Sequence, residues 1–300
     1  MRLFSALDPR VVNETKNAPP GESQLLFHLL RQCFILGITA ADRTRLLSSI
    51  QEMPGDLQLL WTDVLKNRLG RADLHGRDHG NMSLCRLPLA GAQDVHQIVA
   101  RSGAADCPRC GSRHEPWTEL SNSSSVQTCV QQQATNAIQR GTDRSSVYDS
   151  HLGSIARVTE VAVIVDRYAG KSLYENGNAS GLAWLGERLL VDGVQRIVLV
   201  TASGPVSDTQ IGTGIQNLGN AALRAALRVE LRPDGRFKRF AHDRFILLQA
   251  GRVASAYSVG KGLAAFEGNV VRQNSSFANC DGGTVVQTLA DLGVDISAYI

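Results

Sequence analysis

The stretch FAHDRFILLQAGRVASAYSVGKGLAAFEGN, residues 240–269, contains two apolar segments of strand length. RFILLQAG and RVASAYSVG are rich in residues that favour strands, and a glycine at the junction is typical of a turn. A His-Asp-Arg triplet at 242–244 precedes the first segment, and a Gly-Lys-Gly at 260–262 follows the second. The stretch therefore predicts two strands joined by a turn, with a charged motif before and after them.

Strands and helices alternate through the rest of residues 151–300. VTEVAVIVDRYAG is a nearly continuous apolar run of buried-strand length, LAWLGERLLVDG has helical spacing, and QRIVLVTASG is again a buried strand. A helix with Ala and Leu on one face, a short strand, the two strands above and a closing helix in VVQTLADLGVDI follow. This alternation predicts an α/β sandwich over residues 151–300.

Residues 1–150 show a different pattern. Residues 23–69 place apolar residues three and four positions apart, with Pro54-Gly55 as a break, which predicts about three helices. Residues 119–151 are rich in Ser, Thr, Gln and Asn, a composition of loop or weakly specified helix. We therefore expect a mainly helical region over residues 1–150 and a domain boundary near residue 150.

Length and charge set broad limits. A chain of 300 residues exceeds the usual size of one domain, so two domains, or one domain with a helical extension, are expected. The 31 basic and 28 acidic residues leave a formal net charge of +3, which indicates a nucleic-acid binder only if basic residues gather locally. No apolar run approaches a membrane span, and the first residues lack the apolar stretch of a signal peptide, so we expect a cytoplasmic protein.

The six cysteines are widely scattered, which argues against a disulfide framework and fits a reducing compartment. Cys107 and Cys110 stand in a CPRCG turn with His114 close behind, and two thiolates from a tight turn suit a tetrahedral zinc ion. The sequence has no second CxxC. A structural zinc ion at these three residues and a reduced turn with two free thiols are both open.

Polar residues follow the predicted strands, where parallel sheets commonly place their ligand groups. Asp166, Arg167 and Tyr168 end the strand VAVIV, and the small residues of TASG follow the strand RIVLV. Asp166, Arg167 and Tyr168 are candidates for a binding site. Alternatively, they form a strand terminus that turns the chain. The loop TASG is more typical of a plain connection.

Three further residues are candidates for phosphate contacts. Lys261 lies between two glycines, which let the backbone approach an anion closely, and Arg272 and Asn274 lie downstream. For each of them a solvated surface position is the alternative.

The HDR triplet has a structural alternative too, because Asp243 or Arg244 could form an ion pair with Asp166 or Arg167 across the sheet.

DRYAGKSL, the strand RIVLVTAS, the HDR triplet and SVGKGL, in that order, resemble the phospholipase D-like C-terminal domain of MIT-containing trafficking proteins. The resemblance covers residues 157–281 and extends to phospholipase D-like domains in prokaryotic conflict systems. It implies a phospholipase D-like α/β domain at 151–300.

The phospholipase D superfamily cleaves phosphodiesters with two His-x-Lys motifs, in which the histidines act as nucleophile and general acid and the lysines neutralise the phosphate. The resemblance implies these roles for His242 and for Arg244, whose fork suits phosphate oxygens. Because the chain has one such motif, the two-histidine mechanism implies a homodimer. The mechanism requires no metal ion or other cofactor.

Two function classes follow. The first is a metal-independent phosphodiesterase that acts on DNA or RNA in a prokaryotic defence or mobile-element system, with the N-terminal helices recruiting a partner protein. The second is a non-catalytic phosphate-binding or adaptor module that uses the same pocket. The catalytic candidates are His242 and Arg244, and the phosphate-binding candidates are Asp166, Arg167, Tyr168, Asp243, Lys261, Arg272 and Asn274.

Overall fold

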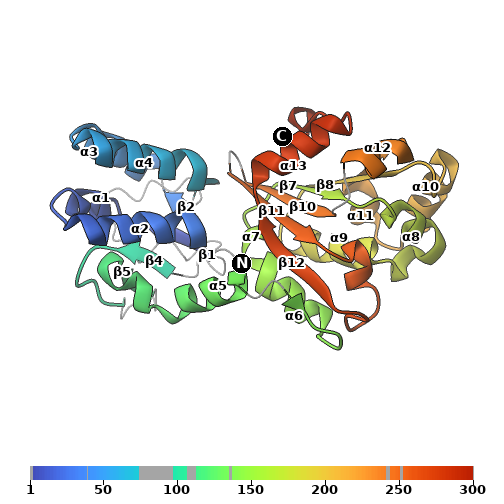
Figure 1. The fold of residues 1–300 in the computed structure, drawn as a ribbon, viewed down its shortest axis with the longest axis horizontal. Helices are drawn as coiled ribbons and strands as arrows, with labels where there is room; N and C mark the ends of the chain where they lie inside the picture. Colours follow the sequence, from blue (N-terminus) through green and yellow to red (C-terminus); the bar gives the residue numbers. More distant parts are fainter. Residues whose placement is uncertain are drawn as a thin grey trace. The chain divides into compact units, whose positions relative to one another are not determined.

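The chain divides into two compact units (Figure 1). The computed structural model describes residues 3–38, 40–73, 97–106, 113–134, 137–240, 244–250 and 253–299. Unit 1 comprises residues 1–134 and 250–253, and unit 2 comprises residues 135–249 and 254–300. The division lies before the boundary expected near residue 150, because the short strand β6 (Ala137–Ile138) pairs with a strand close to the C-terminus.

Unit 1 contains a sheet that the sequence did not lead us to expect. Within the described residues its strand order is β3-β2-β1-β4-β5, and each neighbouring pair is parallel. The strands are β1 (Leu3–Leu7), β2 (Phe34–Ile38), β3 (Leu69–Asp73), β4 (Gln97–Ala100) and β5 (His114–Pro116). Parallel strands need crossover connections, which helices supply from β1 to β2 and from β2 to β3.

The helices of unit 1 are α1 (Pro9–Thr15), α2 (Pro20–Cys33), α3 (Ala40–Gln51), α4 (Gly55–Arg68), the 3₁₀ turn η3 (Trp117–Asn122) and α5 (Ser124–Ala134). Helices α1 and α2 connect β1 to β2, α3 and α4 connect β2 to β3, and the others follow β5. The expectation of a mainly helical region was right for these helices and wrong for the sheet. The strand β2, FILGI, directly follows α2 and is buried along its whole length. A short apolar run of this kind cannot be distinguished from a buried helix by periodicity.

Unit 2 is built on a mixed sheet. Its order in the described part is β6-β12-β11-β10-β7-β8-β9. The strands are β7 (Val161–Val165), β8 (Arg196–Ala202), β9 (Leu227–Arg232), β10 (Phe245–Ala250), β11 (Val253–Val259) and β12 (Ser275–Cys280). β7, β8 and β9 run parallel, and β10 runs antiparallel to β7. The two strands predicted from the opening stretch are confirmed as the neighbours β10 and β11.

Helices cover both faces of this sheet, which gives unit 2 an α/β architecture (Figure 1). Alternate residues of β7 and β8 pack with Phe237, Val285 and Leu289 of α12 (Asp234–Phe240) and α13 (Gly282–Asp291). On the opposite face lie α8 (Ala169–Asn176), which contacts β8, and α9 (Gly181–Val191), while α10 (Asp208–Gln216) packs on α8 and α11 (Ala221–Ala226) packs on α9 (Figure 1). α9 packs closely on its neighbour α11 and on β8, since a Cβ on Gly186 of α9 would lie 2.6 Å from a Leu223 methyl carbon and 3.5 Å from Ile197 Cδ1.

The remaining elements of unit 2 are short. They are α6 (Arg144–Tyr148), the π-helical turn η4 (Asp149–Gly153), α7 (Ser154–Ala156), and the 3₁₀ turns η5 (Gly177–Ala179), η6 (Gly262–Phe266) and η7 (Ile296–Ala298). In the part of the chain that the structure describes, no helix is both long and apolar enough to cross a membrane.

Strand directions determine where the charged motifs meet. β7 and β8 end at the same edge of the sheet because they are parallel. β10 is antiparallel to β7 with Phe245 opposite Val165, so β10 begins where β7 ends. Arg244 and Asp166 therefore lie beside each other although 77 residues lie between them in the sequence.

The imidazole of His151 provides a pH-dependent test of packing in unit 2. It stacks on the Phe277 ring of β12 at a centroid distance of 4.7 Å, and burial lowers its pKa to about 4. The folded state therefore favours neutral His151, whose stabilising contribution is present above the ordinary histidine pKa of about 6.5 and is lost as the pH falls towards about 4. We expect the wild type to lose up to about 2 kcal/mol more unfolding free energy than His151→Phe between pH 7 and pH 5.

Urea unfolding of both proteins at the two pH values measures this difference, because phenylalanine keeps the aromatic contact and removes the titration. An equal loss of stability in wild type and His151→Phe would contradict the assignment.

Candidate functional site

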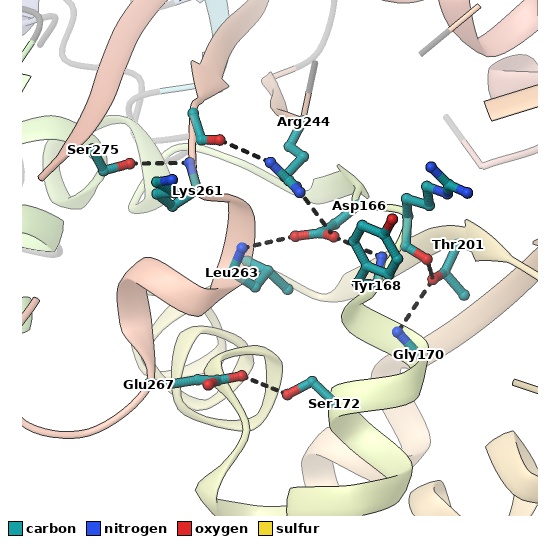
Figure 2. Close-up of polar contacts among 12 residues, drawn as sticks. Asp166, Tyr168, Gly170, Ser172, Thr201, Arg244, Lys261, Leu263, Glu267 and Ser275 are labelled. Carbon is teal, nitrogen blue, oxygen red and sulfur yellow. Dashed lines mark hydrogen bonds and ion pairs between the residues drawn. The ribbon is translucent and has the colours of Figure 1, made fainter. Parts of the chain in front are cut away.

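Three segments distant in sequence converge at one edge of the unit 2 sheet (Figure 2). They are the end of β7, the start of β10 and the Gly-Lys-Gly turn that follows β11. Between them lies a cavity of about 120 Å³ that is open to solvent. It is lined by Asp166, Tyr168, Ala169, Ser172, Leu182, Arg244, Lys261, Leu263, Ala264 and Glu267.

The carboxylate of Asp166 joins the three segments. One oxygen accepts the backbone N–H of Leu263 at 2.8 Å, and the other accepts the backbone N–H of Tyr168 at 2.9 Å (Figure 2). The Nε of Arg244 lies 3.7 Å from the second oxygen. Asp166 itself is buried, with 4% of its surface exposed. It therefore holds its own strand end, the turn after β11 and the start of β10 together.

The environment of Asp166 affects its protonation in opposite directions. Burial raises the pKa of the Asp166 carboxyl, while the N–H donors of Leu263 and Tyr168 and the positive charge of Arg244 oppose this rise. Burial is the larger effect. Ionising Asp166 is thus costly here, and the fold tolerates it because both oxygens have donors.

Arg244 is both a structural and a cavity-lining residue. Its Nη1 donates to the Gly260 carbonyl at 2.8 Å, and its guanidinium carbon lies 5.8 Å from the centre of the Tyr168 ring. The ion pair with Asp166 that the sequence left as an alternative is present. Because 29% of the side chain is exposed, the guanidinium can still contact a ligand in the cavity.

Lys261 presents an exposed ammonium group to the same cavity. Its backbone N–H donates to Ser275 Oγ at 3.1 Å, which holds the turn against the first residue of β12 (Figure 2). The next residue, Gly262, has a φ of +59°, a left-handed conformation that favours glycine. The backbone of the turn is therefore fixed at Lys261 and Gly262, while the side chain of Lys261 reaches solvent.

Gly262 also permits the close approach of the other two segments. A Cβ at this position would lie 2.1 Å from Asp166 Oδ2 and 2.2 Å from Arg244 Cδ. Both distances are far shorter than van der Waals contact. The Asp166–Arg244 pair and this turn can thus occupy the same space only when residue 262 has no side chain.

Other predicted candidates lie outside the cavity. Arg167 binds Asp234 with two hydrogen bonds of 2.7 and 2.8 Å, and this pairing raises the pKa of Arg167. Arg272 and Asn274 are exposed but do not line the cavity, and Asn274 accepts the backbone N–H of Arg140 at 2.8 Å. Of the predicted phosphate-binding residues, the cavity therefore brings together Asp166, Tyr168 and Lys261, beside Arg244.

His242, Asp243, Cys107 and Cys110 lie outside the described residues. His114 is described, and its ring Nδ1 lies 2.7 Å from the Ala105 carbonyl oxygen. Among the described residues, no group of three His, Cys, Asp or Glu side chains is placed to hold a metal ion.

Two polar residues of the cavity were not predicted from the sequence. Ser172 of α8 donates to Glu267 at 2.5 Å across one side of the cavity (Figure 2). Glu267 belongs to no motif, and Ser172 stands in the segment DRYAGKSL but was not singled out, although it lies four residues after Tyr168, one helical turn away. The loop residue Thr201 is structural: its Oγ1 accepts the Gly170 N–H at 3.2 Å and donates to the Arg167 carbonyl at 3.1 Å.

The cavity combines two cationic side chains with two carboxylates. Asp166 and Glu267 both have donors within the fold, whereas the ammonium of Lys261 has no ion-pair partner among the described residues. The Ser172 hydroxyl does not neutralise Glu267, so the lining is mixed in charge. Arg244 and Lys261 are the groups of this lining that can contact an anion. Comparison of the chain with protein-family models and with curated proteins gives no match.

Replacing Gly262 with alanine tests the close approach at the site. The new Cβ would be strained by the positive φ and would collide with Asp166 and Arg244, so we expect Gly262→Ala to lower the unfolding free energy by roughly 3 kcal/mol or more. Gly193→Ala is the matched control, because Gly193 also has a positive φ but no other atom lies within 4 Å of the position that a Cβ would take. We expect it to cost about 1 kcal/mol, from the positive φ alone.

Urea unfolding of the wild type and both variants separates the two contributions. Equal losses in Gly262→Ala and Gly193→Ala would contradict the packing argument.

Proposed function

We propose that unit 2 is a phospholipase D-like domain that binds a phosphate or phosphodiester group in the cavity beside the HDR triplet. The observation that carries this proposal is the convergence of Asp166, Arg244 and the turn at 260–263 on one cavity. These segments belong to three of the four motifs on which the resemblance to phospholipase D-like domains rests.

The polar groups at the cavity suit an anion. The guanidinium of Arg244 is oriented by Asp166 and the Gly260 carbonyl, so little side-chain entropy is lost when it contacts a phosphate. Lys261 adds a mobile ammonium, which binds phosphate as a point charge. A single phosphodiester would thus meet one oriented cation and one adaptable cation.

Binding is the function that the described geometry favours over cleavage. Arg244 has a structural partner in Asp166, which suits a fixed phosphate contact. Its role in binding needs no second copy of the chain. The proposal extends to the nucleic-acid phosphodiesters of a prokaryotic defence or mobile-element system, as the resemblance implies.

Lys261→Ala tests the binding function without disturbing the buried pair. We expect it to weaken binding of a dithymidine phosphodiester roughly fivefold, about 1 kcal/mol, because one exposed phosphate contact is lost. Titration followed by NMR would measure the affinity and show shifts of the Leu263 and Tyr168 amides. Arg196→Ala is the control, since Arg196 is exposed and begins β8 at the opposite end of the strand.

Equal affinities in Lys261→Ala and Arg196→Ala, or amide shifts confined to residues far from the cavity, would sink the binding proposal. Binding should survive His242→Ala, because a phosphate-binding module does not depend on a nucleophile.

Cleavage of the phosphodiester by His242 is a second candidate, favoured by the observation that Arg244 of the same motif lines the cavity. This chemistry would require a homodimer, so that two copies of His242 act on one phosphate as nucleophile and general acid. It would proceed in the presence of EDTA, because no metal ion takes part.

The rate at which purified protein degrades a panel of DNA and RNA substrates in EDTA tests this candidate. We expect His242→Ala to lower any such rate by about 10³-fold or more, because it removes the attacking group, while Arg196→Ala retains it. The same rate in wild type and His242→Ala, or no degradation by the wild type, would exclude catalysis by His242.

A further inference from the structure

Three segments of unit 2 adjoin one another and carry basic residues without acidic ones. Residues 137–142 are AIQRGT, residues 260–263 are GKGL and residues 268–276 are GNVVRQNSS. Their charged side chains are Arg140, Lys261 and Arg272, and all three are exposed. The acidic residues Asp143 and Glu267 stand directly outside these segments, so the positive charge is confined to these three side chains.

Hydrogen bonds join these segments into one surface. The backbone N–H of Lys261 donates to Ser275 Oγ at 3.1 Å, and the backbone N–H of Arg140 donates to Asn274 Oδ1 at 2.8 Å. Because Asn274 and Ser275 are adjacent, Arg140 and Lys261 flank the same short piece of chain, two residues beyond Arg272. We call Arg140, Lys261, Arg272, Asn274 and Ser275 the basic strip.

The cations of the basic strip differ from several other arginines of unit 2 in their ion pairing. Arg167, Arg188 and Arg232 each pair with a carboxylate. By contrast, no carboxylate among the described residues pairs with Arg140, Lys261 or Arg272. Unpaired cations interspersed with Asn, Gln and Ser side chains are the groups that proteins use to contact nucleic-acid phosphates.

The basic strip begins at the cavity, because Lys261 belongs to both. A single phosphate would fill only the cavity, whereas a chain of phosphates could continue along Asn274 and Arg272 towards Arg140. The Tyr168 ring lines the cavity and is 45% exposed, with the guanidinium carbons of Arg167 and Arg244 5.0 and 5.8 Å from its centre. A base can reach the exposed part of this ring only when it is unpaired.

We propose that the basic strip binds the backbone of single-stranded nucleic acid, with one phosphate in the cavity and further phosphates at Arg140 and Arg272. This inference rests on the proposed function and goes further by naming the ligand class and the residues that select it. Affinity then increases with strand length, and each lost cation lowers the dependence of affinity on salt.

Fluorescence anisotropy with labelled thymidylate strands of 2, 4, 8 and 12 nucleotides tests the inference. We expect the wild type to bind longer strands more tightly, and the double variant Arg140→Ala/Arg272→Ala to bind the 12-mer at least about tenfold more weakly. Two lost phosphate contacts should reduce the slope of log affinity against log salt by about 1.4, or about 0.7 for each contact on a single strand.

The control Arg43→Ala/Arg196→Ala removes the same charge from exposed positions outside the basic strip and should bind the 12-mer within about threefold of the wild type. Thermal unfolding of both double variants establishes that they are folded. The dinucleotide should bind the wild type and both double variants alike, because it reaches only the cavity.

Equal 12-mer affinity in the two double variants, an affinity independent of strand length, or equal binding of a 12-base-pair duplex would overturn the inference. Each of these outcomes is compatible with dinucleotide binding at the cavity. If Lys261→Ala leaves dinucleotide binding unchanged, the proposed function fails instead.

Discussion

The carboxylate of Asp166 lies buried where β7 ends and accepts backbone N–H groups from its own strand end and from the turn after β11. It also faces the guanidinium of Arg244 at the start of β10. A buried carboxylate is strongly destabilising unless its oxygens have donors. The three segments therefore have to remain together for the carboxylate to be tolerated, and their convergence creates the cavity.

Gly262 sets the limit on this arrangement. Its positive φ turns the chain, and the absence of a side chain leaves room for Asp166 and Arg244. The same turn brings the Lys261 side chain to the surface and ties its backbone to β12. One structural constraint thus positions an oriented cation inside the cavity and an exposed cation at its edge, where the basic strip begins.

The predictability of the fold differed between the two units. In unit 2, apolar runs such as VAVIV and RIVLV are separated by helical segments, and the α/β alternation could be recognised directly. In unit 1, FILGI adjoins α2 without a turn residue between them, so the strand β2 was hidden within a longer apolar pattern. Parallel pairing adds to the difficulty, because the partners of β2 are remote in sequence.

The sequence by itself determined the alternation of strands and helices in residues 151–300 and the residue types that can meet an anion, because these follow from local periodicity and side-chain chemistry. Only the tertiary structure decided that Asp166, Arg244 and Lys261 share a cavity while Arg167 pairs with Asp234. Strand order and direction bring residues together across long separations, and no local pattern encodes which strand ends become neighbours. The gathering of Arg140, Lys261 and Arg272 has the same origin, since the pairing of β6 with β12 brings residues 137–138 to residues 275–276.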